Sequence, residues 1–184
     1  LIMTLTFNSE NNIILTQRSV QLATKDLLES NVIPLDKLKQ YIRRHSIAVE
    51  YKVFVWKLLL GIVSPYRETR SFKDNINHEI YSKLLATLET CRILTPTTPL
   101  LHKYLYMYLL QKNNSTYLPV QTINEYEHFF EIGNFVCLFN DNDPVKNHRQ
   151  HTNDRLDVEC WMITCSMYEK FSKLLKRSAH LVCN

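Results

Sequence analysis

The sequence predicts an all-α fold, and three observations lead to this prediction. Apolar residues recur every three to four positions along most of the chain, which is the spacing of one face of an α-helix. Only 2 Gly and 6 Pro occur among 184 residues, few for a fold rich in β-hairpins. Hydrophobic residues make up 45% of the chain, which is enough to bury a core. We therefore expect one globular domain of about seven amphipathic helices.

The first two helices are separated by a proline. Residues 20–29 are predicted to form a weakly amphipathic helix, which the segment 31–34 ends. Pro34 is expected in the first turn of the second helix, because the N–H that proline lacks has no partner there. The apolar stripe of this helix consists of Leu35, Leu38, Tyr41 and Ile42.

The third predicted helix contains an unusual run over residues 51–61, with a Trp followed by Lys-Leu-Leu-Leu-Gly. Val53, Trp56 and Leu60 share one helical face. A tryptophan buries a large area, so Trp56 is expected to organise a local core. Gly61 stands where a left-handed residue that ends the helix is expected.

A polar connection over residues 64–75 is expected to lead into the fourth helix. The stripe of that helix is Ile76, Ile80, Leu84, Leu85 and Leu88. Thr98 is then predicted to cap a fifth helix and Pro99 to occupy its first turn. The fifth helix, residues 100–112, is apolar nearly all round, which indicates a central position in the fold.

The sixth helix is predicted over residues 125–140, and its inner face consists of Phe129, Ile132, Val136 and Phe139. Gly133 within it indicates a close helix crossing, since a glycine costs about 1 kcal/mol in a helix. The seventh helix is expected to begin near Asn153 or Asp154. Its predicted stripe is Leu156, Cys160, Ile163, Met167, Phe171 and Leu174, with Trp161 alongside.

The residues that could carry chemistry do not form a convincing site. The five cysteines form no CxxC pair and are odd in number, which fits a reducing cytosol and mostly buried thiols such as Cys137, Cys160 and Cys165. His148, His151, Asp154, Asp157 and Cys160 lie close in sequence, and such residues can bind zinc. A solvated loop followed by a helix cap is the favoured interpretation. No catalytic residue, cofactor site or metal site is predicted.

The charge pattern excludes some classes of partner. The formal net charge is +4 and the basic residues are spread along the chain, so a nucleic-acid-binding surface is not indicated. Lys170, Lys173, Lys176 and Arg177 form a basic cluster. The cluster could contact acidic lipid or a partner, although a solvated helix end is the favoured interpretation. No apolar run is long enough to predict a transmembrane segment.

The run over residues 51–61 also resembles the opening motif of the TBC domain, the fold of the Rab GTPase-activating proteins. The motif residues are Lys52, Trp56, Lys57, Leu60 and Gly61, and Lys52 stands where the family usually has arginine. Further matching pieces, in the family's order and spacing, are residues 92–99, 104–108, 118–119 and the helix around Trp161. The resemblance implies the amino-terminal part of a TBC helical domain over residues 20–177. It implies an extension over 1–19, truncation at the carboxy end and a divergent tail over 178–184.

Active members of that family insert two side chains into the GTPase site. The resemblance implies an arginine from an IxxDxxR motif, which neutralises charge on the transferred phosphoryl group, and a glutamine from a YxQ motif, which orients water. Neither motif occurs here. Residues 76–80 contain Asn and His instead, and the pair Tyr108 and Gln111 is spaced one residue too far. Arg92 and Arg149 could substitute, but nothing around them favours it. The chain is therefore predicted not to be an enzyme.

Within the family, the resemblance is to a non-catalytic subunit, which implies a role in protein interaction. The implied partners are a hamartin-like coiled coil and a tuberin-like GTPase-activating subunit, in a complex that restrains the GTPase Rheb and the kinase mTOR. The alternatives are an active GTPase-activating protein for a Rab-family GTPase, and an inactive fragment or an adaptor for another helical partner. The expected location is the cytoplasm, with lysosomal or vesicle membranes reached through partners. Since the family has further helices, an open apolar face is expected.

Overall fold

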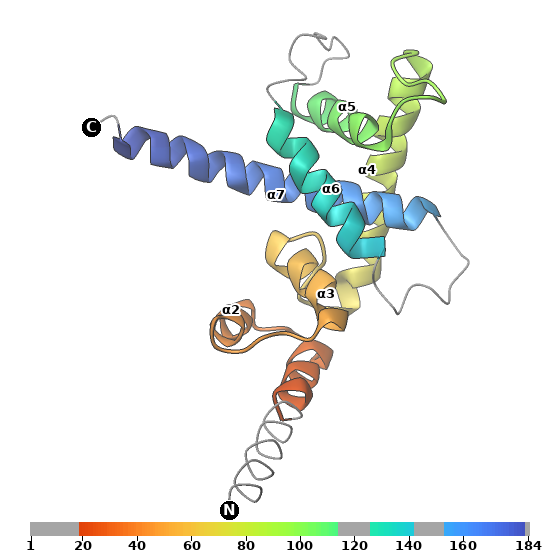
Figure 1. Cartoon of the computed structure of the whole chain (residues 1–184). Coiled ribbons are helices and arrows are strands. Elements are labelled where there is room, and N and C mark those ends of the chain that lie inside the picture. Colours follow the sequence, from red (N-terminus) through yellow and green to blue (C-terminus); the bar gives the residue numbers. More distant parts are fainter. Residues whose placement is uncertain (1–18, 114–125, 142–152, 183–184) are drawn as a thin grey trace, which may run out of the picture.

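The computed structural model describes residues 19–113, 126–141 and 153–182 (Figure 1). These residues form helices, and their β pairing is an isolated bridge between Val32 and Tyr66. The helices are residues 19–29, α2 (Leu35–Arg44), α3 (Val49–Leu60), the 3₁₀ helix η1 (Arg67–Thr69), α4 (Arg70–Thr90), α5 (Leu100–Asn113), α6 (Glu127–Asp141) and α7 (Asn153–Val182). The all-α prediction is confirmed. Most of the predicted extension, and the matching piece at residues 118–119, lie outside the described residues.

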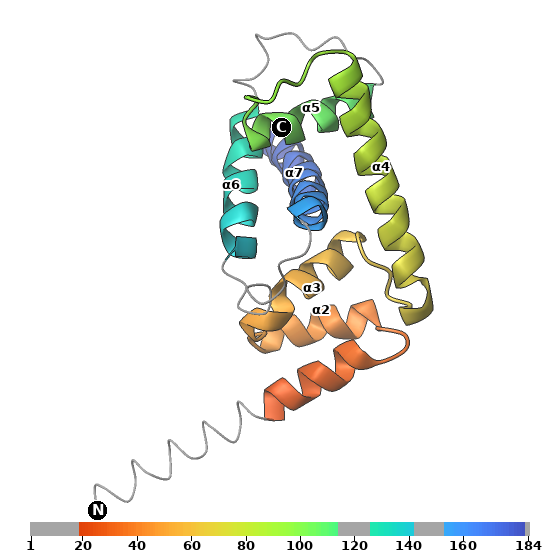
Figure 2. The same cartoon turned by 90° about the vertical axis from the view of Figure 1, so that its right-hand side faces the viewer.

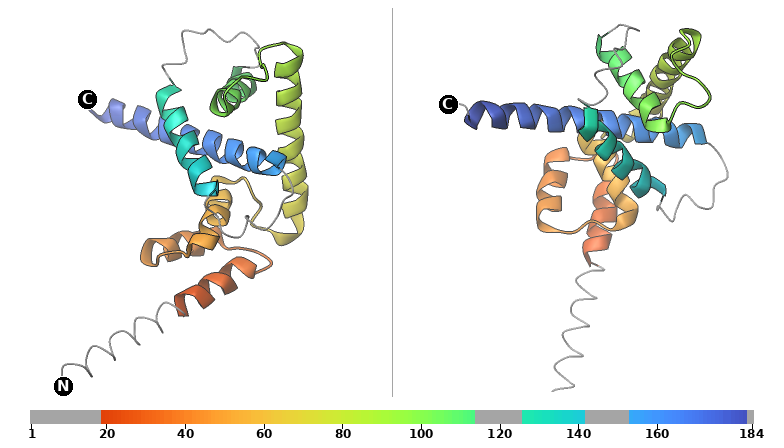
Figure 3. Two further views of the ribbon diagram at one scale, coloured as in Figure 1. Left: turned by 45° about the vertical axis from the view of Figure 1, so that its right-hand side comes forward. Right: turned by 45° about the horizontal axis from the view of Figure 1, so that its top comes forward.

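The helix α7 runs through the middle of the molecule. In Figure 2, α7 lies between α6 and α4, α5 lies across the top, and α3, α2 and residues 19–29 lie below. Figure 3 shows α6 crossing α7, and this pair has the most extensive contact of the described helices. Because α7 lies between other helices, it contributes many buried residues: Val158, Cys160, Trp161, Ile163, Thr164 and Cys165.

The buried residues form two clusters, and α3 contributes to both. The larger cluster joins α4, α5, α6 and α7, and α3 contributes Val53 to it. The smaller cluster joins residues 19–29 and α2 to another face of α3, which contributes Val55 and Leu58. A helix that is apolar nearly all round is expected to be covered on more than one face, and α3 is covered in this way.

The tryptophan at the centre of the core is Trp161, and the expectation for Trp56 is wrong. Trp161 on α7 is fully buried, and its indole N–H donates a hydrogen bond to the carbonyl of Tyr104 on α5 (3.2 Å). Its ring meets the edge of Tyr81 on α4, with centroids 5.7 Å apart. Trp56 is only partly buried, since the positions of α3 that enter the two clusters are taken by Val53, Val55 and Leu58.

The helix α4 begins at Arg70, so part of the predicted polar connection is already helical. The first turns of α4 are mostly polar, and Phe72 there is 67% exposed, so apolar periodicity could not reveal them. The buried positions of α4 are Asn77, Tyr81 and Leu88, whereas Ile80, Leu84 and Leu85 of the predicted stripe are partly buried. The buried face of α4 is therefore centred closer to Asn77 than the predicted apolar stripe is.

Pro34 and Pro99 were predicted in the first turn of a helix, but each lies just before the first helical residue. Both α2 and α5 begin after the proline, at Leu35 and Leu100. The hydroxyl of Thr98 accepts a hydrogen bond from the Thr95 N–H (2.9 Å), so it closes the preceding loop. The helix α5 lies across one end of the molecule and not at its centre (Figure 2), but its apolar surface is covered, and its fully buried residues are Tyr104, Leu105 and Met107.

The second half of α7 departs from its predicted stripe. The helix continues to Val182, through most of the predicted tail. Phe171 and Leu174 were expected to face the core, but they are 40% and 59% exposed. Phe171 meets the ring of His128, which lies in the first turn of α6 (centroids 5.6 Å apart). The buried part of α7 thus ends near the position where α6 begins.

Gly133 marks a close helix crossing, as predicted. A Cβ atom at this position would lie 2.8 Å from Leu101 of α5 and 3.5 Å from Thr164 of α7. The absence of a side chain therefore lets three helices approach one another. The nearest atom is the tip of the Leu101 side chain, which can rotate to make room for one methyl group.

This crossing predicts how substitutions at Gly133 affect stability. In Gly133→Ala, the gain in helix propensity offsets the displacement of Leu101, so the free energy of unfolding should change by less than about 1 kcal/mol. Gly133→Leu should lower it by about 1–3 kcal/mol, because the larger side chain overpacks the crossing. Urea unfolding measures both, with exposed Asn134→Leu as the control. A Gly133→Leu variant as stable as Asn134→Leu would contradict the crossing.

Candidate functional site

The TBC-like motif residues all lie on α3 and its end, where this helix meets α6 and α7. The ring of Trp56 packs against Phe139 of α6 at a centroid distance of 4.7 Å and against Phe135 at 5.9 Å. Leu60 packs on the larger cluster, and Lys52 is half-buried. These positions show that the motif builds the contact between the amino-terminal helices and the rest of the fold.

Gly61 ends α3 in the left-handed conformation that its position predicted, with φ at 77°. Its N–H donates to the carbonyl of Leu58 (3.1 Å), and the N–H of Ile62 donates to that of Lys57 (2.9 Å). This pair of bonds is the Schellman ending of a helix. The turn directs Ile62 into the larger cluster, where its carbonyl accepts a hydrogen bond from the buried Asn77 amide (3.0 Å).

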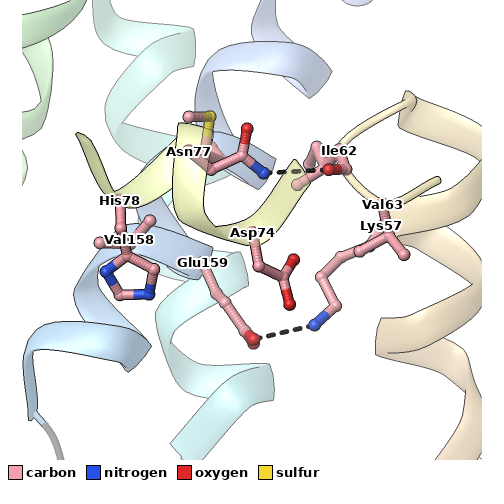
Figure 4. Close-up of a pocket in the computed structure, with 9 residues that line it drawn as sticks. Lys57, Ile62, Val63, Asp74, Asn77, His78, Val158 and Glu159 are labelled. Carbon is pink, nitrogen blue, oxygen red and sulfur yellow. Dashed lines mark hydrogen bonds and ion pairs between the residues drawn. The ribbon is translucent and has the colours of Figure 1, made fainter. Parts of the chain in front are cut away.

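One of the two lysines of the motif, Lys57, is paired across the fold. Its ammonium lies 2.8 Å from the carboxylate of Glu159 on α7, and the two side chains are 15% and 20% exposed. Figure 4 shows the pair beside Asp74 and His78 of α4, which line the same cleft. The cleft has room for about one water molecule. It therefore suits an ion pair that joins α3 and α7 beside α4 better than it suits a substrate.

A second lysine links α7 to the end of α3. The ammonium of Lys170 donates a hydrogen bond to the carbonyl of Leu59 (2.9 Å), in the last turn of α3. Positive charge is favourable there because the last carbonyls of a helix point outward and carry partial negative charge. Lys170 and Glu159 thus attach α3 at two points along α7.

The described residues contain no group of three or more His, Cys, Asp or Glu side chains that could hold a metal ion. His148 and His151 lie outside the described residues, and the side chain of Asp154 is not described. Asp157 lies 3.4 Å from the hydroxyl of Tyr104 and Cys160 is buried. Burial, with a contribution from Asp157, raises the pKa of the Tyr104 hydroxyl, so this group stays protonated.

The regions that correspond to the family's two catalytic motifs contain residues that stabilise the fold. Asn77 is buried and holds the Ile62 carbonyl, and His78 lines the cleft. Tyr108 is a core residue whose ring packs on Phe129 (5.6 Å between centroids). Arg92 follows the end of α4 with φ at 55°, in a conformation that only few non-glycine residues adopt. Arg149 lies outside the described residues.

Similar sequences among curated proteins carry one name, TBC1 domain family member 7. The Bos taurus protein is 33% identical over 85 residues, and the Homo sapiens protein is 32% identical over 85 residues. The Danio rerio protein is 26% identical over 87 residues. The Bos taurus match covers 46% of this chain but only 29% of that relative's length. The chain thus matches less than a third of these relatives, and no protein-family model matches it.

The relatives support the resemblance to TBC-domain proteins that the α3 motif carries. None of the helices in the described part of the chain is both long enough and apolar enough to cross a membrane.

We expect the Lys57–Glu159 pair to stabilise the attachment of α3 to α7. A double-mutant cycle with Lys57→Met and Glu159→Gln should give a coupling free energy of about 1–2 kcal/mol, because both groups are largely removed from water. The matched cycle at the exposed pair Lys25 and Glu29 should give only a few tenths of a kcal/mol. Urea unfolding of both sets measures the two couplings. Equal couplings would show that the Lys57 pair adds nothing beyond a surface contact.

The cysteines should differ in reactivity. Burial raises the pKa of the Cys165 thiol well above its usual range, so the reactive thiolate is scarce there, whereas Cys91 is exposed. A maleimide reagent should modify Cys91 at least about tenfold faster than Cys165 in the native protein. Peptide mass spectrometry measures both rates, and denaturant should remove the difference. Similar rates without denaturant would contradict a closed core around α7.

Proposed function

We propose that this chain is a TBC-type helical protein that acts by binding other proteins rather than by catalysis. In this proposal it resembles the third subunit of the tuberous sclerosis complex and binds a hamartin-like coiled coil. A tuberin-like subunit supplies the GTPase-activating chemistry toward Rheb, upstream of mTOR. The α3 motif and the family name of the similar proteins support the TBC part of this proposal.

The observation that carries the proposal is an apolar surface where α3 meets α6. We call it the α3–α6 surface, and it consists of Trp56, Phe135, Leu138 and Phe139. Phe135 is 51% exposed and Leu138 is 64% exposed, and they lie three residues apart on one face of α6. Large exposed side chains beside a partly buried indole form a surface on which an amphipathic helix can pack.

The residue types at the regions of the two finger motifs argue against GTPase activation: residues 76–80 contain no arginine, and Gln111, one residue beyond the motif spacing from Tyr108, is exposed at the end of α5. An arginine finger needs a mobile charged side chain that can enter the GTPase site, and it contributes about 10³–10⁵ in rate. Asn77 is buried and committed to a backbone carbonyl, and Tyr108 is packed among aromatic rings. Asn77 therefore cannot act as a mobile finger, and the case against a glutamine finger rests on the spacing of Tyr108 and Gln111.

The proposal predicts a complex between this chain and the carboxy-terminal coiled coil of hamartin. Size-exclusion chromatography with light scattering should show co-elution at a defined mass. The double variant Phe135→Ser/Leu138→Ser should weaken this binding at least about tenfold, because it removes exposed apolar contacts. Phe72→Ser, which changes a 67% exposed residue on α4, should leave the binding unchanged.

Failure to co-elute, with the chain folded, would overturn the coiled-coil role. The alternative, an active GTPase-activating protein for a Rab-family GTPase, is tested by single-turnover GTP hydrolysis over a panel of Rab proteins. We expect no acceleration, whereas an activator with an arginine finger should give about 10³-fold or more.

A further inference from the structure

The positive charge of the chain is concentrated in the second half of α7. The whole sequence has 22 Lys and Arg against 18 Asp and Glu. Four of the basic residues, and none of the acidic ones, lie between Lys170 and Val182. The rest of the chain therefore has 18 of each and is formally neutral. This half of α7, residues 170–182, is called the basic segment below.

The basic segment extends beyond the packed helices. In Figures 1 and 3, α7 continues well past its crossing with α6, and its carboxy end stands apart from the other helices. Phe171 and Leu174 are 40% and 59% exposed there, and Lys173 is exposed beside them. Two large apolar side chains and a cation are thus presented together at the start of the basic segment.

The helical register separates the two kinds of residue. Positions 171, 174, 178 and 181 recur at intervals of three and four and share one face of α7, and three of them are Phe or Leu. Positions 173, 176 and 177 are Lys or Arg and fall in a different arc of the helix, whereas Lys170 precedes Leu174 by four residues and lies at the boundary. The segment therefore combines an apolar face and a basic face along one helix.

We propose that the basic segment of α7 is a binding site for anionic lipid surfaces. A helix with lysines on its polar face and Phe and Leu on the other can lie in the plane of a membrane interface, with its apolar face among the acyl chains. Attraction to acidic headgroups acts over about a Debye length, and a helix that carries the chain's whole net charge orients the molecule toward them. A protein groove would need its own acidic lining, whereas an anionic bilayer supplies this charge uniformly.

The proposal does not depend on the proposed coiled-coil function, because it uses a different surface. Phe135 and Leu138 belong to the α3–α6 surface, whereas Phe171 and Leu174 lie on α7. Lys170 also donates to the carbonyl of Leu59, so the start of the basic segment is tied to the fold. The lipid contact begins at Phe171, one residue beyond this tie.

Vesicle flotation with the full chain tests the proposal. Vesicles of phosphatidylcholine with 30% phosphatidylserine should retain the chain in low salt, and phosphatidylcholine alone should not. Raising the salt to 0.5 M should release most of it, because salt screens the attraction. Lys173→Glu should weaken binding at least about fivefold. Leu174→Ser should weaken it about tenfold, since a leucine is removed from the apolar face.

Two matched variants control for general effects. Lys37→Glu makes the same charge change on α2, and Leu22→Ser removes a leucine that is 62% exposed in residues 19–29. Both should bind vesicles like the parent chain, and circular dichroism melts should show that all four variants fold. Equal binding to both kinds of vesicle, no binding to either, or equal losses in the controls would overturn the proposal. Loss of vesicle binding with intact coiled-coil binding would confirm that the surfaces are separate.

Discussion

The fold depends on α3 being packed on two faces at once. Val53 enters the larger cluster, and Val55 and Leu58 enter the smaller one, so the two clusters share one helix. The left-handed turn at Gly61 continues this division, because Ile62 joins the larger cluster and Val63 the smaller. Most residues lack the freedom to take that conformation without strain, which explains the position of the glycine. Because the two clusters meet in α3, neither is complete without it.

Polar contacts fix α3 in place where apolar packing alone would leave its orientation open. The Asn77 amide holds the Ile62 carbonyl, Glu159 holds Lys57, and Lys170 holds the last turn of α3. Each of these bonds has its own direction, whereas dispersion contacts between aliphatic side chains tolerate rotation and sliding. The motif residue Lys57 therefore has a structural explanation that does not need catalysis. The indole of Trp56 is partly buried against Phe135 and Phe139, and the proposed surface for a partner helix is centred there.

The sequence predicted the helices well because their apolar residues repeat at helical intervals. It also predicted the helix end at Gly61 and the helix crossing at Gly133, because a glycine at either position is unfavourable without such a role. It assigned the wrong role to Trp56, since periodicity cannot tell which of two tryptophans is at the centre and which is at an edge. Asn77 was missed because a buried amide looks like a polar surface residue until its partner, the Ile62 carbonyl, is known. The Lys57–Glu159 pair joins residues 102 positions apart, and no local pattern carries such a contact. Candidate sites therefore depended on a family resemblance, which describes fold more reliably than it describes chemistry.

The first half of α7 is buried and its residues are set by packing, whereas the side chains described in its second half are mostly exposed, which leaves this half free to serve a surface function. In the first half, Trp161, Ile163 and Thr164 are covered on several sides, so their identity is set by packing. In the second half, Phe171 and Leu174 keep the helical spacing of apolar residues although much of their surface is exposed, and most of the cations lie on another face. Solvation alone does not require large apolar residues on one face. The proposed bilayer contact accounts for this spacing, because an anionic bilayer accepts both an apolar and a basic face. Since Lys170 is the residue of this half that holds α3, residues beyond it can be changed to test binding while the two clusters stay intact.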